Sequence, residues 1–126
     1  MMRVFHTDRA PAAIGPYAQA VEAGGFLFSA GQIGLIPETG EFAGEDVATQ
    51  AVQVLQNLAA ILREAGLSFS DVVKTTMYLA TMDEFPLVNT IYERYFTQPY
   101  PARSTVAAAG LPKGARIEID VVARRP

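Results

Sequence analysis

The sequence has no cysteine and only one histidine among its 126 residues. Without cysteine, disulfide bonds, thiolate nucleophiles and cysteine-ligated metal ions are excluded. The single histidine, His6, lies close to the first residue, where it is poorly placed for a triad of serine, histidine and acid. Because the acidic residues are scattered and form no recognised ligand spacing with His6, we expect no metal site.

Basic residues and long apolar runs are also scarce. The net charge is −3 at pH 7, the pI is about 5.0 and the only basic cluster is Arg124-Arg125, so a protein that binds nucleic acid through its charge is disfavoured. No segment approaches membrane-spanning length, and charged residues interrupt the first positions, which argues against a signal peptide. We therefore expect a cytoplasmic protein that binds neither nucleic acid nor a membrane.

Hydrophobic residues make up 50% of the chain, which is enough for a core without crosslinks. A chain of this length fits one domain that buries roughly 65–70% of the surface of its unfolded state. We therefore expect a single domain over residues 1–126. The glycines form neither of the phosphate-binding patterns GxGxxG and GxxxxGK, so a phosphate-cradling loop is not indicated.

Apolar residues at spacings of three and four predict an amphipathic helix over residues 46–65, whose polar face includes Asn57. Gly66 is expected to end this helix as a left-handed cap. A second helix follows, with Asp83 as its cap and Pro86 in its tolerant first turn. Alternating or β-branched residues predict strands near Val4 and over residues 17–22, 26–33, 72–80, 103–107 and 115–123.

This order of elements predicts an α+β domain with a mixed or mostly antiparallel sheet and two helices packed on one face. Gly31 interrupts the strand over residues 26–33, and we interpret it as a bulge in preference to a close approach of another group to its backbone. The second face of the sheet lacks a covering layer. Since a small domain of mean hydropathy +0.17 often covers such a face with another subunit, we expect a homo-oligomer.

Two charged side chains on apolar strands, Arg103 and Glu118, are candidates for chemistry. A guanidinium binds a carboxylate through two points and a nearby carboxyl group can transfer protons, so the pair suggests a site for a small anionic substrate. Each residue alone also fits a structural role, Arg103 in an ion pair and Glu118 on the hydrated face of its strand. A cleft between subunits would satisfy both interpretations.

Two polar residues could support such a site. Asn89 lies among Phe85, Tyr92 and Phe96 at helical spacing, and an amide in apolar surroundings must find hydrogen-bond partners, either in the backbone or in a site. Tyr17 stands at the start of a predicted strand. It could offer its phenol to a pocket or simply pack there.

The chain resembles the RidA/YjgF/YER057c/UK114 family of reactive-intermediate deaminases over nearly its whole length. The run from Pro101 to Ile119, with its Pro-Ala-Arg-Ser start and its Ile-Glu-Ile end, is similar to the family signature. The other matching segments are Ala10-Pro11, Ala13-Ile14-Gly15-Pro16-Tyr17, Gly31-Gln32-Ile33, Ala65-Gly66-Leu67, Val72-Val73-Lys74-Thr75-Thr76, Val88-Asn89, Tyr92 and Phe96. The resemblance implies a chorismate-mutase-like fold and a homotrimer, with a central barrel, the helices outside and three clefts between subunits.

The resemblance also implies an activity, which is the cofactor-free hydrolysis of 2-imino acids such as 2-iminopropanoate and 2-iminobutanoate to 2-keto acids and ammonia. In this activity Arg103 and the backbone N–H of Thr105 would bind the substrate carboxylate. Glu118 would act as general base and later return a proton to the leaving ammonia, aided by the carbonyl of Gly31. The residues that would shape the pocket are Tyr17 and Asn89.

Two positions depart from the pattern of this family. Ala30 stands where many members have serine, although Ser29 is adjacent, and Thr105 stands where several members have cysteine. Since the contact implied for Thr105 uses its backbone, that change should be tolerated. The change at Ala30 bears on substrate preference.

Two other functions compete with the deaminase interpretation. In a non-catalytic metabolite-binding or regulatory trimer, Arg103 would bind keto acids or other carboxylates without any reaction. The third function, RNA cleavage or inhibition of translation, is disfavoured by the acidic balance of the chain.

Overall fold

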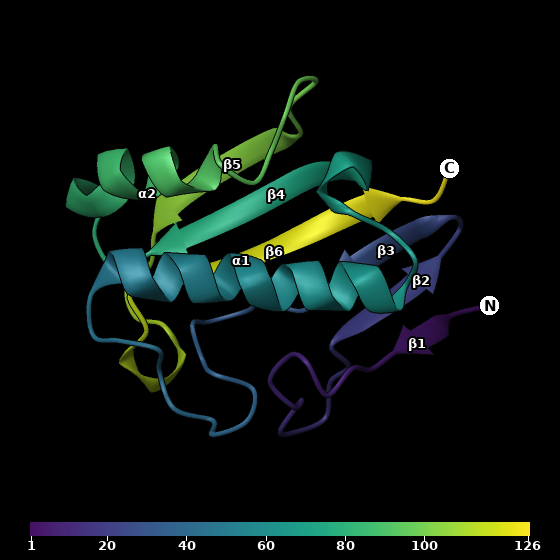
Figure 1. Cartoon of the computed structure of the whole chain (residues 1–126), viewed down its shortest axis with the longest axis horizontal. Helices are drawn as coiled ribbons and strands as arrows, with labels where there is room; N and C mark the ends of the chain where they lie inside the picture. Colours follow the sequence, from purple (N-terminus) through teal and green to yellow (C-terminus); the bar gives the residue numbers. More distant parts are fainter.

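A mixed six-stranded sheet forms the frame of the protein and carries two α-helices on one of its faces (Figure 1). The computed structural model describes residues 1–126, with the strand order β1-β2-β3-β6-β4-β5. β4 and β5 run parallel, and all other neighbours are antiparallel. This arrangement confirms the predicted α+β class and element order. The elements are β1 (Arg3–Phe5), β2 (Ala20–Ala23), β3 (Phe26–Ser29), α1 (Val47–Glu64), β4 (Val72–Leu79), α2 (Phe85–Tyr92), β5 (Ala102–Ala107) and β6 (Ile117–Arg124).

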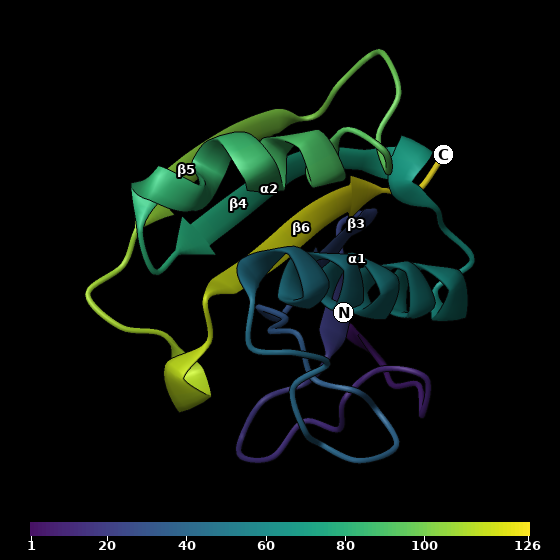
Figure 2. The same ribbon diagram turned by 60° about the vertical axis from the view of Figure 1, so that its left-hand side comes forward.

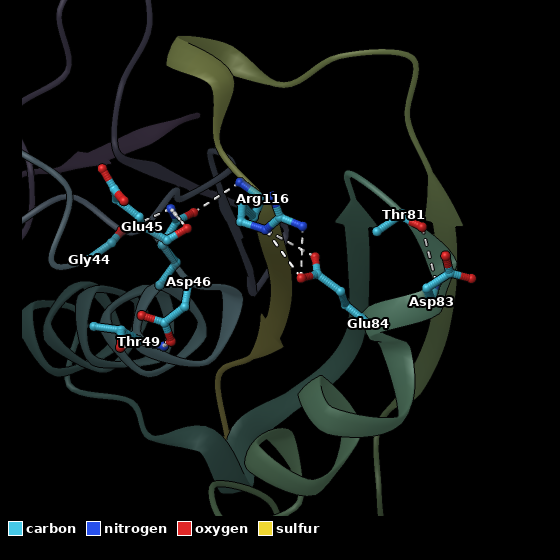
Figure 3. Close-up of polar contacts among 9 residues, drawn as sticks. Gly44, Glu45, Asp46, Thr49, Thr81, Asp83, Glu84 and Arg116 are labelled. Carbon is cyan, nitrogen blue, oxygen red and sulfur yellow. Dashed lines mark hydrogen bonds and ion pairs between the residues drawn. The ribbon is translucent and has the colours of Figure 1, made fainter.

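Helix α1 begins and ends as its sequence predicts. The Asp46 carboxylate accepts a hydrogen bond of 2.9 Å from the N–H of Thr49 and so caps the first turn (Figure 3). At the other end Gly66 adopts a φ of 76°, and the N–H of Leu67 donates to the carbonyl of Leu62 at 2.8 Å, which is the geometry of a left-handed glycine cap. The periodic apolar residues are all buried: Val47, Ala51, Leu55, Leu58, Leu62 and Ala65.

Asn57 differs from the prediction, which placed it on the polar face of this helix. Its side chain is buried at 1% exposure, because a loop packs against α1 beside the sheet. The Asn57 Nδ2 donates to the carbonyl oxygens of Ile33 at 3.3 Å and Leu35 at 3.0 Å. Helical periodicity identifies the face that meets the sheet, but it carries no signal for a polar loop contact on another face.

The second helix begins differently from the sequence prediction. A short 3₁₀ turn, Met82–Glu84, precedes α2. Thr81, rather than Asp83, is the cap, because the Thr81 hydroxyl accepts a hydrogen bond of 3.2 Å from the Asp83 N–H (Figure 3). Pro86 lies in the first turn of α2, as expected. Hydroxyl and carboxylate side chains both cap helices, so the residue types alone do not decide between them.

Three strands are shorter than the sequence predicts. β2 begins only at Ala20, and β3 ends at Ser29, after which a single bridge at Gln32 continues the pairing. β6 begins at Ile117, because a tight turn precedes it in which Lys113 has a φ of 56°. The segments that leave the sheet in this way become loops at one end of β6.

The two α-helices cover only one of the two faces of the sheet, and we call the other the uncovered face. Figures 1 and 2 show α1 and α2 on the same side of the strands. β6 buries Ile117, Ile119 and Val121 on that side, at 0–1% exposure, whereas Glu118 and Asp120 point to the opposite side. By strand register, the uncovered face also presents exposed apolar side chains, which are Val4, Phe26, Phe28 and Val106.

No helix of the protein combines the length and the hydrophobicity that crossing a membrane requires.

Replacing Asp46 by alanine is expected to lower the melting temperature by about 4 °C at neutral pH, because α1 loses its cap. The hydrogen bonds from Thr49 hold the pKa of the Asp46 carboxyl below its usual value. This stabilisation is therefore present above the unfolded-state pKa and is lost as the pH falls through the folded-state pKa. Thermal unfolding followed by circular dichroism should show wild type and variant converging in acid.

Asp83→Ala is the matched control for this measurement, since Asp83 takes part in its cap through the backbone N–H and not through the carboxylate. It should leave the melting temperature nearly unchanged. An equal loss at both positions would contradict the assignment of the caps.

Candidate functional site

Glu118 lies in a surface concavity of about 560 Å³, which we call the Glu118 pocket. The lining comes from the segments 11–17, 30–35 and 112–113, all of them loops around the beginning of β6. Tyr17 and Gly31, two further residues predicted from the sequence, line the same pocket. The structure therefore brings three of the predicted site residues together.

Gly31 is in direct contact with the Glu118 side chain. A Cβ atom added at Gly31 would lie 2.8 Å from the Glu118 Cδ and closer still to Oε2, so any side chain at this position would displace the Glu118 carboxylate. Gly31 also lies between the end of β3 and the bridge at Gln32, outside any regular strand. Both interpretations of this glycine hold. The Glu118 side chain approaches its backbone closely, and the three residues 29–31 stand opposite only two residues of β6 between the Phe28–Val122 and Gln32–Ile119 pairs, as in a bulge.

The Glu118 carboxyl is partly removed from water. Burial is the main reason why its pKa lies above the ordinary value, and the negative charge of Asp120 on the same strand raises it further. A carboxylate with a raised pKa is a stronger base than an exposed one and exchanges its proton nearer to neutral pH. Glu118 therefore has the environment of a group that can accept a proton from water.

Buried amide side chains hold two of the loops that line the Glu118 pocket. Gln19, at 2% exposure, accepts a hydrogen bond of 2.8 Å from the N–H of Thr7 and donates one of 2.8 Å to the carbonyl of Pro11. Asn57 holds the loop at Ile33 as described above. Sequence reasoning missed both supporting residues, because an isolated Gln or Asn has no pattern that names its backbone partner.

The segment that leads into β6 is fixed by a second polar network (Figure 3). The N–H of Arg116 donates to the Gln50 Oε1 at 2.9 Å, and its guanidinium contacts the Glu84 carboxylate, with Nη2 at 2.8 Å from Oε2. These contacts connect α1, the turn before α2 and the start of β6. They fix the backbone two residues before Glu118, so the carboxylate is carried by a rigid element.

Arg103 extends from β5 toward α2 and lies in a different concavity. Its Nη1 donates to the Asn89 Oδ1 at 2.8 Å. Its guanidinium carbon lies 4.7 Å from the centre of the Tyr92 ring and 5.2 Å from that of Phe85. This concavity of about 340 Å³, which we call the Arg103 pocket, is also lined by Tyr100. The structure thus brings Asn89 and Arg103 together and leaves other guanidinium N–H groups free for a ligand.

The Tyr92 ring beneath Arg103 is itself held by the core. Its hydroxyl lies 2.9 Å from the Thr75 Oγ1, and Thr75 is fully buried. Burial raises the pKa of the Tyr92 phenol, which keeps it protonated. In the sequence Tyr92 resembles the other aromatic residues on the apolar face of α2, and Thr75 resembles an ordinary β-branched strand residue, so neither was predicted to belong to a site.

The backbone N–H of Thr105 points to the free edge of the sheet. β5 is the last strand in the sheet order, with only β4 as a neighbour. Beyond its end, the N–H of Ala108 donates to the carbonyl of Leu79 on β4 at 2.9 Å. Because backbone groups alternate in direction along a strand, the N–H of Thr105 points away from β4 and has no partner in the sheet. It is available to a ligand at the edge that Arg103 shares.

Within one chain, Arg103 and Glu118 lie on opposite faces of the sheet. Arg103 pairs with the buried Thr75 on the face that carries the helices. Glu118 pairs with Tyr78 on the uncovered face. One chain therefore presents two separate candidate half-sites, and a small ligand bound within one chain cannot reach both groups.

Comparison with known proteins groups the chain with one family. Residues 7–125 match the family described as endoribonuclease L-PSP. The chain is 51% identical over 120 residues to the Arabidopsis thaliana protein named Reactive Intermediate Deaminase A, chloroplastic, covering 95% of this chain and 64% of that protein. It is 48% identical over 121 residues to the Homo sapiens protein named 2-iminobutanoate/2-iminopropanoate deaminase, covering 96% and 88%. The solved structure of E. coli TdcF with bound serine matches with a TM-score of 0.93 and 41% identity, covering 98% of this chain and 99% of that one.

Replacing Thr75 by valine is expected to lower the free energy of unfolding by about 1–3 kcal/mol, because the buried Tyr92 hydroxyl loses its partner. The change is nearly isosteric and preserves the β-branched side chain that suits a strand. Urea denaturation measures the loss.

Thr97→Val serves as the control, since Thr97 is exposed and its hydroxyl makes no hydrogen bond within the chain. It should change the free energy of unfolding by less than about 0.5 kcal/mol. Equal destabilisation by both variants would show that the hydrogen bond to Tyr92 is not the cause.

Proposed function

The chain belongs to the endoribonuclease L-PSP family, which is the RidA/YjgF/YER057c/UK114 family, and we propose that it hydrolyses reactive 2-imino acids to 2-keto acids and ammonia. The observation that carries this proposal is the pair of half-sites. One offers an oriented guanidinium with a free backbone N–H beside it, and the other offers a desolvated carboxylate. A 2-imino acid needs both, since it has an anionic carboxylate next to an electrophilic carbon.

The proposal includes a homotrimer of chorismate-mutase-like subunits, in which the sheets form a central barrel and the sites lie between neighbours. Two observations support such an assembly. The uncovered sheet face exposes apolar side chains such as Phe26 and Phe28, and exposed patches of this kind mark interfaces. The separation of Arg103 from Glu118 within one chain also requires a second copy to complete a site.

In the proposed reaction, Arg103 of one subunit binds the substrate carboxylate. Asn89 and the rings of Tyr92 and Phe85 hold the guanidinium in one orientation, so little entropy is lost on binding. The N–H of Thr105 donates a further hydrogen bond to the same carboxylate. The anion is thereby fixed, and with it the direction in which the imine carbon faces.

Glu118 of the neighbouring subunit acts on water. Its carboxylate takes a proton from a water molecule oriented by the Gly31 carbonyl while the water oxygen bonds to the imine carbon, and the C=N electron pair moves to nitrogen. Glu118 then returns this proton to nitrogen, which gives a carbinolamine. In a second transfer Glu118 takes the proton of the new hydroxyl group and passes it to nitrogen, so that the C=O bond forms, the C–N bond breaks, and ammonia and the keto acid leave. Tyr17 closes the side of the Glu118 pocket. Because the imine carbon is already electrophilic, positioning and proton transfer are sufficient and no cofactor enters the proposed reaction.

A second candidate function is non-catalytic binding of a small metabolite. The structure of the E. coli relative contains bound serine, which is an amino acid with the same carboxylate group. The Arg103 pocket would be used in the same way for such a ligand. The two functions differ only in whether Glu118 transfers a proton.

The decisive experiment generates the imine in place with a serine or threonine dehydratase and follows the release of keto acid. Wild type should accelerate release, Glu118→Gln should reduce kcat by about 10²–10⁴-fold, and Arg103→Ala should mainly raise KM. Arg94→Ala and Asp83→Asn are controls at exposed positions outside both pockets. A labelled RNA in the same assay should stay intact. No acceleration by wild type, with keto acid still bound through Arg103, would favour the second candidate.

Complementation tests whether the site lies between subunits. Arg103→Ala and Glu118→Gln chains are unfolded together and refolded as a mixture, which is assayed at a substrate concentration well below the KM of Arg103→Ala, where each variant alone is expected to have little activity. If Arg103 and Glu118 come from different copies, random assembly should make about a quarter of the sites intact. Light scattering of wild type should give the mass of three chains. A monomer, or a mixture that stays inactive despite assembling, would contradict the proposed site.

A further inference from the structure

A cluster of charges extends from Glu118 along the uncovered face of the sheet. Asp120 lies two residues further along β6 and pairs with Thr76, and Lys74 lies on the adjacent strand β4, where it pairs with Val122. Residues two apart on one strand share a face and lie about 7 Å apart. Lys74, Asp120 and Glu118 therefore form one row of three charged groups that spans two neighbouring strands.

Lys74 is held in this row by hydrogen bonds. Its Nζ donates to the Ser104 Oγ at 3.0 Å and to the carbonyl of Thr75 at 3.3 Å. The long side chain is thereby kept on the sheet surface between β5 and β6 instead of extending into water. Its ammonium therefore lies toward β5, on the side of β4 away from β6, and acts on Asp120 as a positive charge at a distance and not as an ion pair.

Asp120 has no role in binding or proton transfer in the proposed reaction, yet it is only partly exposed. Burial raises the pKa of its carboxyl, and the positive charge of Lys74 opposes this effect. Lys74 therefore keeps Asp120 ionised to lower pH than its burial alone would allow. An ionised Asp120 in turn opposes the ionisation of Glu118.

We propose that Lys74 and Asp120 are positioning residues of the site, which act together on Glu118 and control its charge state in the working enzyme. The negative charge of Asp120, which Lys74 stabilises, makes Glu118 a stronger base. It also favours the protonated form of Glu118 until the proton is transferred to the substrate nitrogen. This inference rests on the proposed function for its consequence in catalysis. The coupling between the three groups exists whether or not the protein is a deaminase.

Other groups also face Glu118 and must be considered with the cluster. Tyr78 lies opposite it on β4, and Tyr17 and Lys113 enter the Glu118 pocket from its loops. β5 contributes the neutral Ser104 to this face, and β3 contributes Phe28. Of these groups only Lys113 is charged at neutral pH, and its sign is opposite to that of Asp120. Asp120 is therefore the nearest negative charge that this chain places on the same face.

The test replaces Asp120 by asparagine, which preserves the shape and removes the charge. Glu118 should then ionise at lower pH, so the acid limb of the kcat/KM profile moves to lower pH. At a pH on that limb, kcat/KM should rise at least about two- to threefold, which is the effect of one unit charge about 7 Å away in bulk water and a lower bound for a partly buried site. The plateau at higher pH should fall, because Glu118 becomes a weaker base.

Lys74→Met tests the second half of the cluster. Asp120 should then titrate at higher pH and closer to Glu118, and the acid limb should broaden. In the Asp120→Asn background the same change should leave the limb where it is, because Lys74 acts through Asp120. Asp83→Asn, at an exposed position away from this face, should leave the whole profile unchanged.

Carboxyl ¹³C NMR titration of the assembled protein measures Glu118 and Asp120 directly and without any substrate. A Glu118 titration that does not move in Asp120→Asn would overturn the inference, even if the enzyme is active. A Glu118 titration that moves as expected in a protein without deaminase activity would support the cluster and refute only the proposed function. A drop in kcat/KM at every pH with no shift of the limb would indicate that Asp120 has a purely structural role, and would also overturn the inference.

Discussion

The alternation of side chains along β6 is the constraint on which the other features of the protein depend. Because successive strand residues point to opposite faces, Ile117, Ile119 and Val121 pack under the helices while Glu118 and Asp120 face the uncovered side. Each buried aliphatic side chain contributes about 1.5–3 kcal/mol. A shift of β6 by one residue would expose all three and bury both carboxylates, so the core itself determines where the proposed base stands.

Buried polar side chains extend this control from the sheet to the loops. Gln19, Gln50 and Asn57 are only 1–3% exposed, and each bonds to the backbone of a segment outside its own element. An amide buried without partners would cost a large part of the stability of the protein, so these bonds must form when the chain folds. Irregular segments around the Glu118 pocket are therefore held by specific hydrogen bonds to buried side chains. A site made largely of loops can in this way keep a defined shape.

Sequence patterns predicted the elements well and their ends less well. Periodicity and local caps depend on neighbours within one or two turns, which explains why Asp46 and Gly66 were placed correctly at the ends of α1. The start of α2 and the end of β3 depend on competing local bonds, so Asp83 was wrongly taken as the cap and the β3 strand was predicted too long. Asn57 was misplaced for a related reason, since its partners lie on a loop that helical periodicity does not describe.

The sequence by itself determined the α+β class, the order of the elements and the importance of the segment that carries Arg103 and Glu118, because hydrophobic periodicity and motif spacing are local properties. Only the tertiary structure decided how these residues relate to one another. It brought Asn89 to Arg103, filled the space above Gly31 with the Glu118 side chain, and placed the two charged residues on opposite faces of one sheet. These relations follow from strand register and from packing between distant segments, where the free energy of burying the core selects one arrangement among many that the local sequence allows.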